Sequence, residues 1–65
     1  MDPYISHSPW RREDWKGHAT KKAVRQAIAY DRGRDRLSIF VLDHTPAGPV
    51  YELAPREQWD ALFTD

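Results

Sequence analysis

Cysteine is missing from this 65-residue sequence, and long hydrophobic runs are missing as well. Without cysteine the chain forms no disulfide, which fits a reducing compartment. No stretch approaches the roughly 18 apolar residues of a membrane-spanning helix. The opening residues, Met1 to Tyr4, lack the charged and apolar regions of a signal peptide. We therefore expect a soluble, cytoplasmic protein without a membrane partner.

A net charge is also missing, because ten Lys and Arg balance ten Asp and Glu. Domains committed to DNA usually carry a clear positive excess. The two signs are nevertheless separated along the chain. Residues 1–36 hold nine basic and five acidic residues, a net +4, whereas residues 37–65 hold one Arg and five acids, a net −4. This asymmetry indicates either a basic contact surface or ordinary solvated faces.

The short length allows one domain with a small core. A chain of this size buries only about 60% of the surface that its unfolded form exposes, and its core supplies about 3–5 kcal/mol. Residues 1–7 show no periodicity and are expected to form a flexible arm. Residues 8–65 are then the single small α+β domain.

Helix signals dominate the first half. Ser8-Pro9 is typical of a helix start, and Gly17 of a stop, so a short helix or turn is expected over Trp10–Lys16. Thr20 can cap a second helix that begins at Lys21 and continues to about Ala27. Residues 26–31 fit either the end of this helix or a strand.

Strand signals dominate the second half. Arg36–Asp43 alternates apolar side chains and predicts a strand, as does Pro49–Leu53 after a loop. A last helix opens at Pro55, with an apolar face. The expected fold is α+β: a small antiparallel sheet of two or three strands, an N-terminal helical segment and a C-terminal amphipathic helix. The expected core consists of Val24, Ile28, Leu37, Ile39, Val41, Val50, Leu53, Trp59, Leu62 and Phe63.

From Ala27 onward the chain resembles the small KTSC domain, which occurs alone in bacteria and phages and fused to some lysyl-tRNA synthetases. The resemblance covers residues 27–63 and is carried by Ala27-Ile28-Ala29-Tyr30-Asp31, Arg36-Leu37-Ser38-Ile39-Phe40, Gly48-Pro49-Val50-Tyr51-Glu52-Leu53 and the closing segment 55–63. It implies the order strand, turn, strand, strand, helix, with Tyr30 in the first strand. It implies no catalytic residue.

Motifs of catalysis and metal binding are not found. The three histidines, His7, His18 and His44, are far apart and lack the spacing of metal ligands. No serine lies in a Gly-x-Ser-x-Gly motif, and the three glycines are isolated, which excludes a phosphate-binding loop of the usual kind. We expect no enzymatic activity, no cofactor and no metal.

Cations and tryptophans are interleaved in the segment Trp10–Arg25, and two more arginines follow in the next turn. Trp and Arg are frequent at the energetic centres of protein interfaces, and the separated charges suit a charged partner or a homodimer. A chain this short is typical of regulators and inhibitors, including phage-encoded ones. The predicted partner-binding residues are Trp10, Arg11, Arg12, Trp15, Lys16, Lys21, Lys22, Arg25, Arg32 and Arg34.

Nucleic-acid binding through the same residues is the alternative prediction. Lys and Arg neutralise phosphates, and tryptophan rings can stack on exposed bases. The expected order helix, helix, strand, strand is similar to a winged helix. In the competing interpretation both Trp10 and Trp15 belong to the core, since a small domain needs its largest side chains inside.

Overall fold

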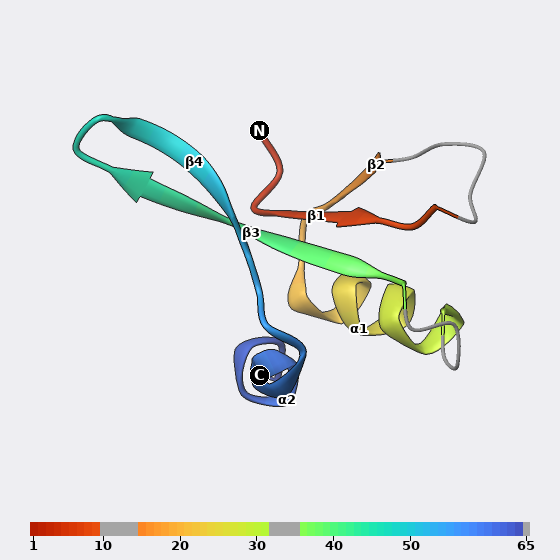
Figure 1. The fold of residues 1–65 in the computed structure, drawn as a ribbon. Coiled ribbons are helices and arrows are strands. Elements are labelled where there is room, and N and C mark those ends of the chain that lie inside the picture. Colours follow the sequence, from red (N-terminus) through yellow and green to blue (C-terminus); the bar gives the residue numbers. More distant parts are fainter. Residues whose placement is uncertain (10–14, 32–35, 65) are drawn as a thin grey trace.

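Four strands and two helices make up the computed structural model, which describes residues 1–9, 15–31 and 36–64 (Figure 1). The elements in this part of the chain are β1 (Tyr4–His7), β2 (Trp15–His18), α1 (Lys21–Tyr30), β3 (Ser38–Thr45), β4 (Gly48–Leu53), the 3-10 turn η1 (Arg56–Gln58) and α2 (Trp59–Leu62). The strands form one antiparallel sheet in the order β2-β1-β3-β4. The class is α+β, as expected, but the architecture differs.

The prediction of a two- or three-stranded sheet behind an N-terminal helical segment is wrong. Residues 4–7, expected to be a flexible arm, form β1 in the middle of the sheet, paired with both β2 and β3. The helix expected over Trp10–Lys16 is wrong at its end, because Trp15 and Lys16 belong to β2. The remaining residues of that prediction, 10–14, lie outside the described part of the chain. The described elements therefore do not follow the order helix, helix, strand, strand. The predicted similarity to a winged helix is wrong for the same reason.

Helix α1 begins as the sequence predicts. The Thr20 side chain accepts a hydrogen bond of 3.1 Å from the backbone N–H of Ala23, which satisfies one of the free donors of the first turn. The helix continues to Tyr30. The strand alternative for residues 26–31 is wrong, and Tyr30 does not lie in a strand. The backbone N–H of Asp31 closes the last turn by donating to the Ala27 carbonyl at 3.2 Å.

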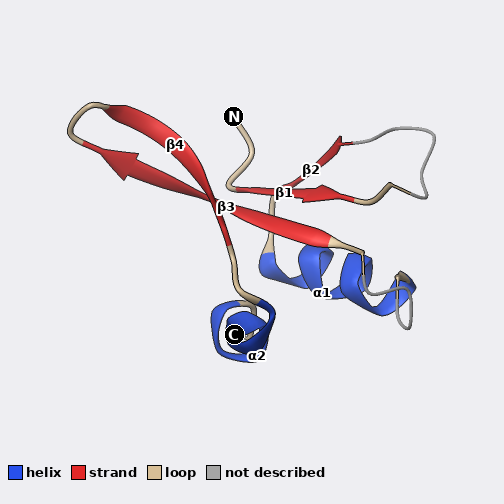
Figure 2. Cartoon of the chain, viewed as in Figure 1, coloured by secondary structure: helices blue, strands red, loops and turns tan. Residues whose placement is uncertain are grey.

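The core lies between the sheet and the helices, which both cover the same face of the sheet (Figure 2). Half of the expected core is buried there: Val24, Leu37, Ile39, Trp59 and Phe63. Ile28 and Val41 pack against it. The prediction is wrong for three residues that are considerably exposed: Val50 at 44%, Leu53 at 60% and Leu62 at 37%.

The exposure of Val50 follows from the shape of the sheet, whereas Leu53 pairs with Phe40 next to β1 and Leu62 belongs to α2. The β3–β4 hairpin extends well past the end of β1, so its distal half has no neighbouring strand or helix (Figure 1). Residues such as Val50 therefore remain in water although they alternate correctly for a strand. None of the helices in the described ranges is long and apolar enough to cross a bilayer.

Contacts of Phe63 hold the C-terminal helix against the rest of the domain. Its ring meets the ring of Tyr4 edge to face, with centroids 5.8 Å apart and an interplanar angle of 85°. Its carbonyl accepts a 2.5 Å hydrogen bond from the Arg25 guanidinium. Because Tyr4 belongs to β1 and Arg25 to α1, this one residue joins the first strand, the first helix and the end of α2.

Candidate functional site

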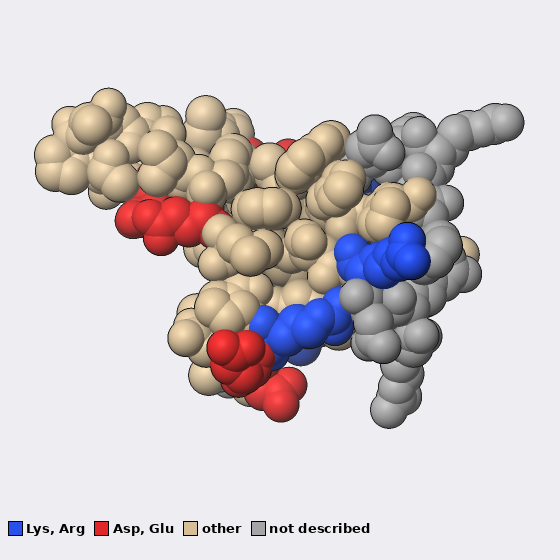
Figure 3. All heavy atoms as spheres, in the orientation of Figure 1, with Lys and Arg blue, Asp and Glu red and all other residues tan. Residues whose placement is uncertain are grey.

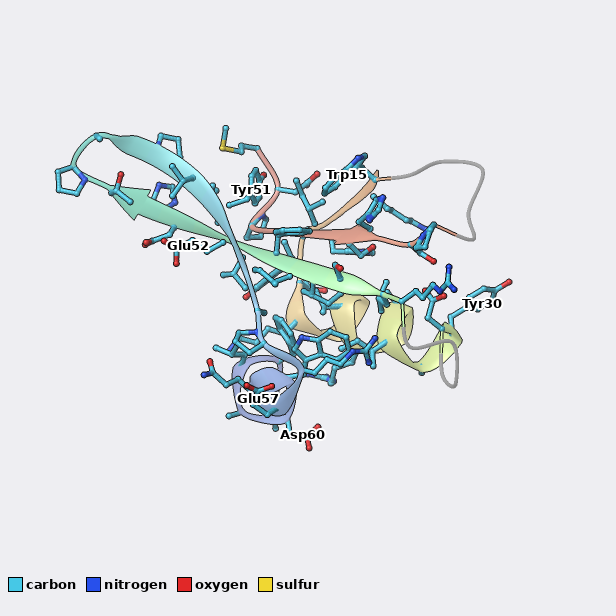
Figure 4. The ribbon with its side chains drawn as sticks, in the orientation of Figure 1. Trp15, Tyr30, Tyr51, Glu52, Glu57 and Asp60 are labelled. Atoms are coloured by element: carbon cyan, nitrogen blue, oxygen red, sulfur yellow. The ribbon has the colours of Figure 1, made fainter. Side chains whose placement is uncertain are left out.

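The sheet has one covered and one open face. Side chains alternate along a strand, so the strand pairing assigns each residue to a side. We define the outer face as the positions that point away from α1 and α2: Ile5, His7, Trp15, Gly17, Ser38, Phe40, Leu42, His44, Pro49, Tyr51 and Leu53. Apolar and aromatic side chains dominate this set, and no described helix covers it (Figure 4).

Trp15 is the most conspicuous member of the outer face. Its ring lies 4.5 Å from the His7 ring and 5.5 Å from the Phe40 ring, measured between centroids. Despite these two contacts, 58% of its surface is exposed. Leu53, which pairs with Phe40 across β3 and β4, is 60% exposed. The result is a continuous apolar strip that crosses the sheet from β2 to β4.

Tyr51 continues the outer face toward the start of the chain. Its hydroxyl donates a 2.6 Å hydrogen bond to the carbonyl of Asp2. The Asp2 side chain lies against Gly17, so close that a Cβ at Gly17 would overlap it. Asp2 therefore lies against the outer face, in contact with residues of β2 and β4, while most of the Trp15 surface stays exposed.

The described residues of the predicted basic contact segment lie on different parts of the fold. Trp15 points to the outer face, whereas its neighbour Lys16 points to the face that bears the helices. Lys21 and Lys22 open α1. Arg25 binds the Phe63 carbonyl and so has a role inside the fold. The remaining predicted residues, Trp10, Arg11, Arg12, Arg32 and Arg34, lie outside the described part of the chain.

The separation of charge along the sequence is also visible in space. In Figure 3 the acidic side chains lie under the β3–β4 hairpin and on the C-terminal helical segment, while Lys and Arg lie toward α1 and the start of β3. Figure 4 labels Glu52 on the hairpin, Glu57 in η1 and Asp60 in α2. In Figure 3 the basic side chains adjoin the acidic ones of the C-terminal segment, so the two signs are only partly separated in space.

A concave surface lies between β2 and α1. It is a cavity of about 660 Å³, bordered on one side by Lys16, Gly17 and His18 and on the other by Ala23, Ala27 and Tyr30. We call it the β2–α1 groove. Its volume lies within the range of about 300–1,000 Å³ that is typical of ligand sites. The exposed Trp15 stands on the opposite side of the same strand.

Two hydrogen bonds between polar side chains are buried behind this groove. The Ser6 hydroxyl and His18 Nε2 lie 2.8 Å apart, and the Ser8 hydroxyl donates to Asp31 at 3.3 Å. Both serines are fully buried, at 0% exposure. Their hydroxyls satisfy neighbouring side chains, as buried polar groups generally must be satisfied.

Metal ligands are not gathered anywhere in residues 1–9, 15–31 and 36–64, where no three His, Asp or Glu side chains could hold one ion. His7, His18 and His44 lie on different parts of the sheet: on the outer face next to Trp15, on the inner face of β2, and near the hairpin tip. Their separation in the sequence is therefore preserved in space.

Comparisons of the chain with protein-family models, curated proteins and solved structures found no match. The resemblance of residues 27–63 to the KTSC domain therefore stays a prediction. The outer face and the β2–α1 groove are described from their own geometry alone.

Sequence reasoning missed both surfaces. Tyr4 and Ser6 face one side of β1 and Ile5 and His7 the other, so each side carries one apolar and one polar residue and the segment shows no strand pattern in the sequence. The groove had no signal in the sequence, because its two walls come from a strand and a helix that only the folded chain brings together.

Proposed function

We propose that this chain is a noncatalytic protein-binding module, a regulator or inhibitor, that holds its partner on the outer face of the sheet. The exposure of Trp15 carries the proposal. A domain with so small a core would gain stability by burying a tryptophan, yet this ring is 58% exposed. Tryptophan is among the residues that dominate the binding energy of protein interfaces.

The surroundings of Trp15 support a protein partner over a nucleic acid. Bases could stack on the rings of Trp15 and Phe40, and this favours nucleic-acid binding as the second candidate. Phosphates, however, need cations beside the stacked bases, and the outer face as defined above holds no Lys or Arg. An apolar strip with polar residues at its border is typical of protein interfaces.

Two further parts of the proposal rest on the sequence. A cytoplasmic location is favoured by the absence of cysteine. The opposite charges at the two ends of the chain would steer a charged partner into place, and the same charges would permit two copies to pair.

The test compares the full chain with two variants. Trp15→Ser removes the exposed ring from the outer face, and Leu62→Ser removes an exposed apolar side chain from α2, on the other side of the sheet. Each tagged protein is used to capture partners from a nuclease-treated lysate, and the captured protein is purified so that its affinity can be measured by calorimetry.

We expect Trp15→Ser to weaken binding of the purified partner by about thirtyfold, the equivalent of a hot-spot residue worth about 2 kcal/mol. Leu62→Ser should bind like the wild type. Equal affinities for Trp15→Ser and wild type would contradict the proposed surface. Recovery of nucleic acid alone in untreated lysate, with no protein retained after nuclease, would favour the second candidate.

A further inference from the structure

Strand β2 is an edge of the sheet in the part of the chain that the structure describes. It pairs with β1 on one side only. Backbone N–H and C=O groups on the other side of an edge strand point outward, where they can pair with another strand. In β2 this free side borders the β2–α1 groove, because Lys16, Gly17 and His18 line it.

Helix α1 forms a second wall that matches the strand in length. Its ten residues rise about 1.5 Å each and extend for about 15 Å, while the four residues of β2 extend for about 13 Å. The wall facing the groove includes Ala23 and Ala27, whose short side chains leave space beside the strand. The two walls of the groove therefore match in length over the span of a short extended peptide.

Three lysines lie in or next to the groove. Lys16 lines it from β2, and Lys21 and Lys22 open α1 without being part of its lining. No acidic residue lies in the first turn of α1, so the positive end of the helix dipole adds to the same field. The carboxylate at the other end, Asp31, is buried and accepts a hydrogen bond from Ser8.

We infer that the β2–α1 groove binds an extended acidic segment of the partner protein, which adds to the sheet as a further strand beside β2. This inference rests on the proposed function and names a second contact of the same interaction. Main-chain hydrogen bonds to an edge strand supply affinity in this mode of recognition, and alternate side chains supply specificity. One side of the added strand faces α1, and the other continues the outer face next to Trp15.

The test uses a short blocked peptide that alternates Glu and Val, added to the full isotope-labelled chain and followed by NMR. Three peptides serve as probes: the acidic peptide, the same sequence with Lys in place of Glu, and the acidic peptide with alternate backbone nitrogens methylated. Methylation removes main-chain donors and leaves the charge unchanged, so it separates strand addition from simple attraction.

Two variants of the chain probe the walls. Ala27→Leu fills the groove, and Ala29→Leu places the same side chain at an exposed position of α1 that does not line it. We expect the acidic peptide to shift the amide signals of β2 and α1, the Lys and methylated peptides to bind at least tenfold more weakly, and Ala27→Leu to lose binding while Ala29→Leu retains it.

The inference is overturned if the three peptides bind alike, if the shifts map to the outer face alone, or if Ala27→Leu binds as the wild type does. The captured partner separates this failure from failure of the proposed function. A partner that depends on Trp15 but binds Ala27→Leu normally would leave the function standing and remove the groove from it.

Discussion

Replacement of Phe63 by Ala tests whether one residue near the end of the chain holds the domain together. The Phe63 side chain is 1% exposed and meets the Tyr4 ring edge to face. The backbone carbonyl that accepts the Arg25 hydrogen bond is kept in the variant. The experiment therefore measures the ring and its packing.

The expected loss is large relative to the stability available. A buried Phe→Ala substitution costs about 3–5 kcal/mol, from lost burial and from the cavity that remains. Of this, the edge-to-face pair with Tyr4 accounts for about 0.5–1.5 kcal/mol. A core of this size supplies only about 3–5 kcal/mol. Phe63→Ala should consequently leave a large fraction of the chain unfolded at room temperature, without any denaturant.

Urea titration followed by far-ultraviolet circular dichroism gives the free energy of unfolding directly. The matched control is Leu62→Ala, one residue earlier and 37% exposed, for which we expect a loss below about 1 kcal/mol. A Phe63→Ala variant that stays folded with a loss below about 1 kcal/mol would refute the reasoning, since the C-terminal helix would then contribute little to the core.

Two further substitutions test the polar contacts of the fold. Ser6→Ala removes the hydroxyl that lies 2.8 Å from His18 Nε2. It should lower the free energy of unfolding by about 1–3 kcal/mol, the cost of losing a buried partner. Ser6→Thr is the control that keeps a hydroxyl, and an unchanged free energy of unfolding for Ser6→Ala would contradict the role of this bond. Thr20→Ala removes the acceptor for the Ala23 N–H and should lower the free energy of unfolding by about 1 kcal/mol in the same titration. Thr20→Asp can still cap the helix and should leave the free energy of unfolding unchanged. Equal losses of free energy for both variants would show that the cap contributes nothing.

The parts of the fold that could be predicted are those encoded locally. Thr20 followed by an Ala-rich stretch defines the start of α1 from neighbouring residues alone. Ile39 and Leu37 alternate within a strongly β-forming run and are buried as expected. Trp59 and Phe63, four residues apart, share one helical face and reach the core. In each case the signal lies within a single turn or strand.

The parts that could not be predicted depend on distant residues. Ser6 is buried in the centre of the sheet because His18, twelve positions away in the chain, satisfies its hydroxyl. A serine at this position makes β1 look like a polar arm in the sequence. Strand β2 contains Gly17 and Lys16, both poor strand formers, and exists because β1 lies beside it. Neither strand is defined by its own composition.

The described residues of the predicted contact segment are separated for a related reason. Proximity in the sequence placed Trp15 and Lys16 in one basic, aromatic surface, but consecutive residues on a strand point to opposite faces. Arg25 was assigned to a partner and instead binds the Phe63 carbonyl. The segment from Trp15 to Arg25 is thus divided among the outer face, the groove and the core.

The central position of β1 has a consequence for the order in which the protein folds. Strand β1 leaves the ribosome before β3, with which it pairs, so that Tyr4 faces Val41 across the sheet. Pairings between residues so far apart close a long loop of chain and slow folding relative to local contacts. The β3–β4 hairpin and α1, by contrast, are built from neighbours. We therefore expect both to form early, with the N-terminal strand inserted last, so that the sheet is completed only after most of the chain has been synthesised.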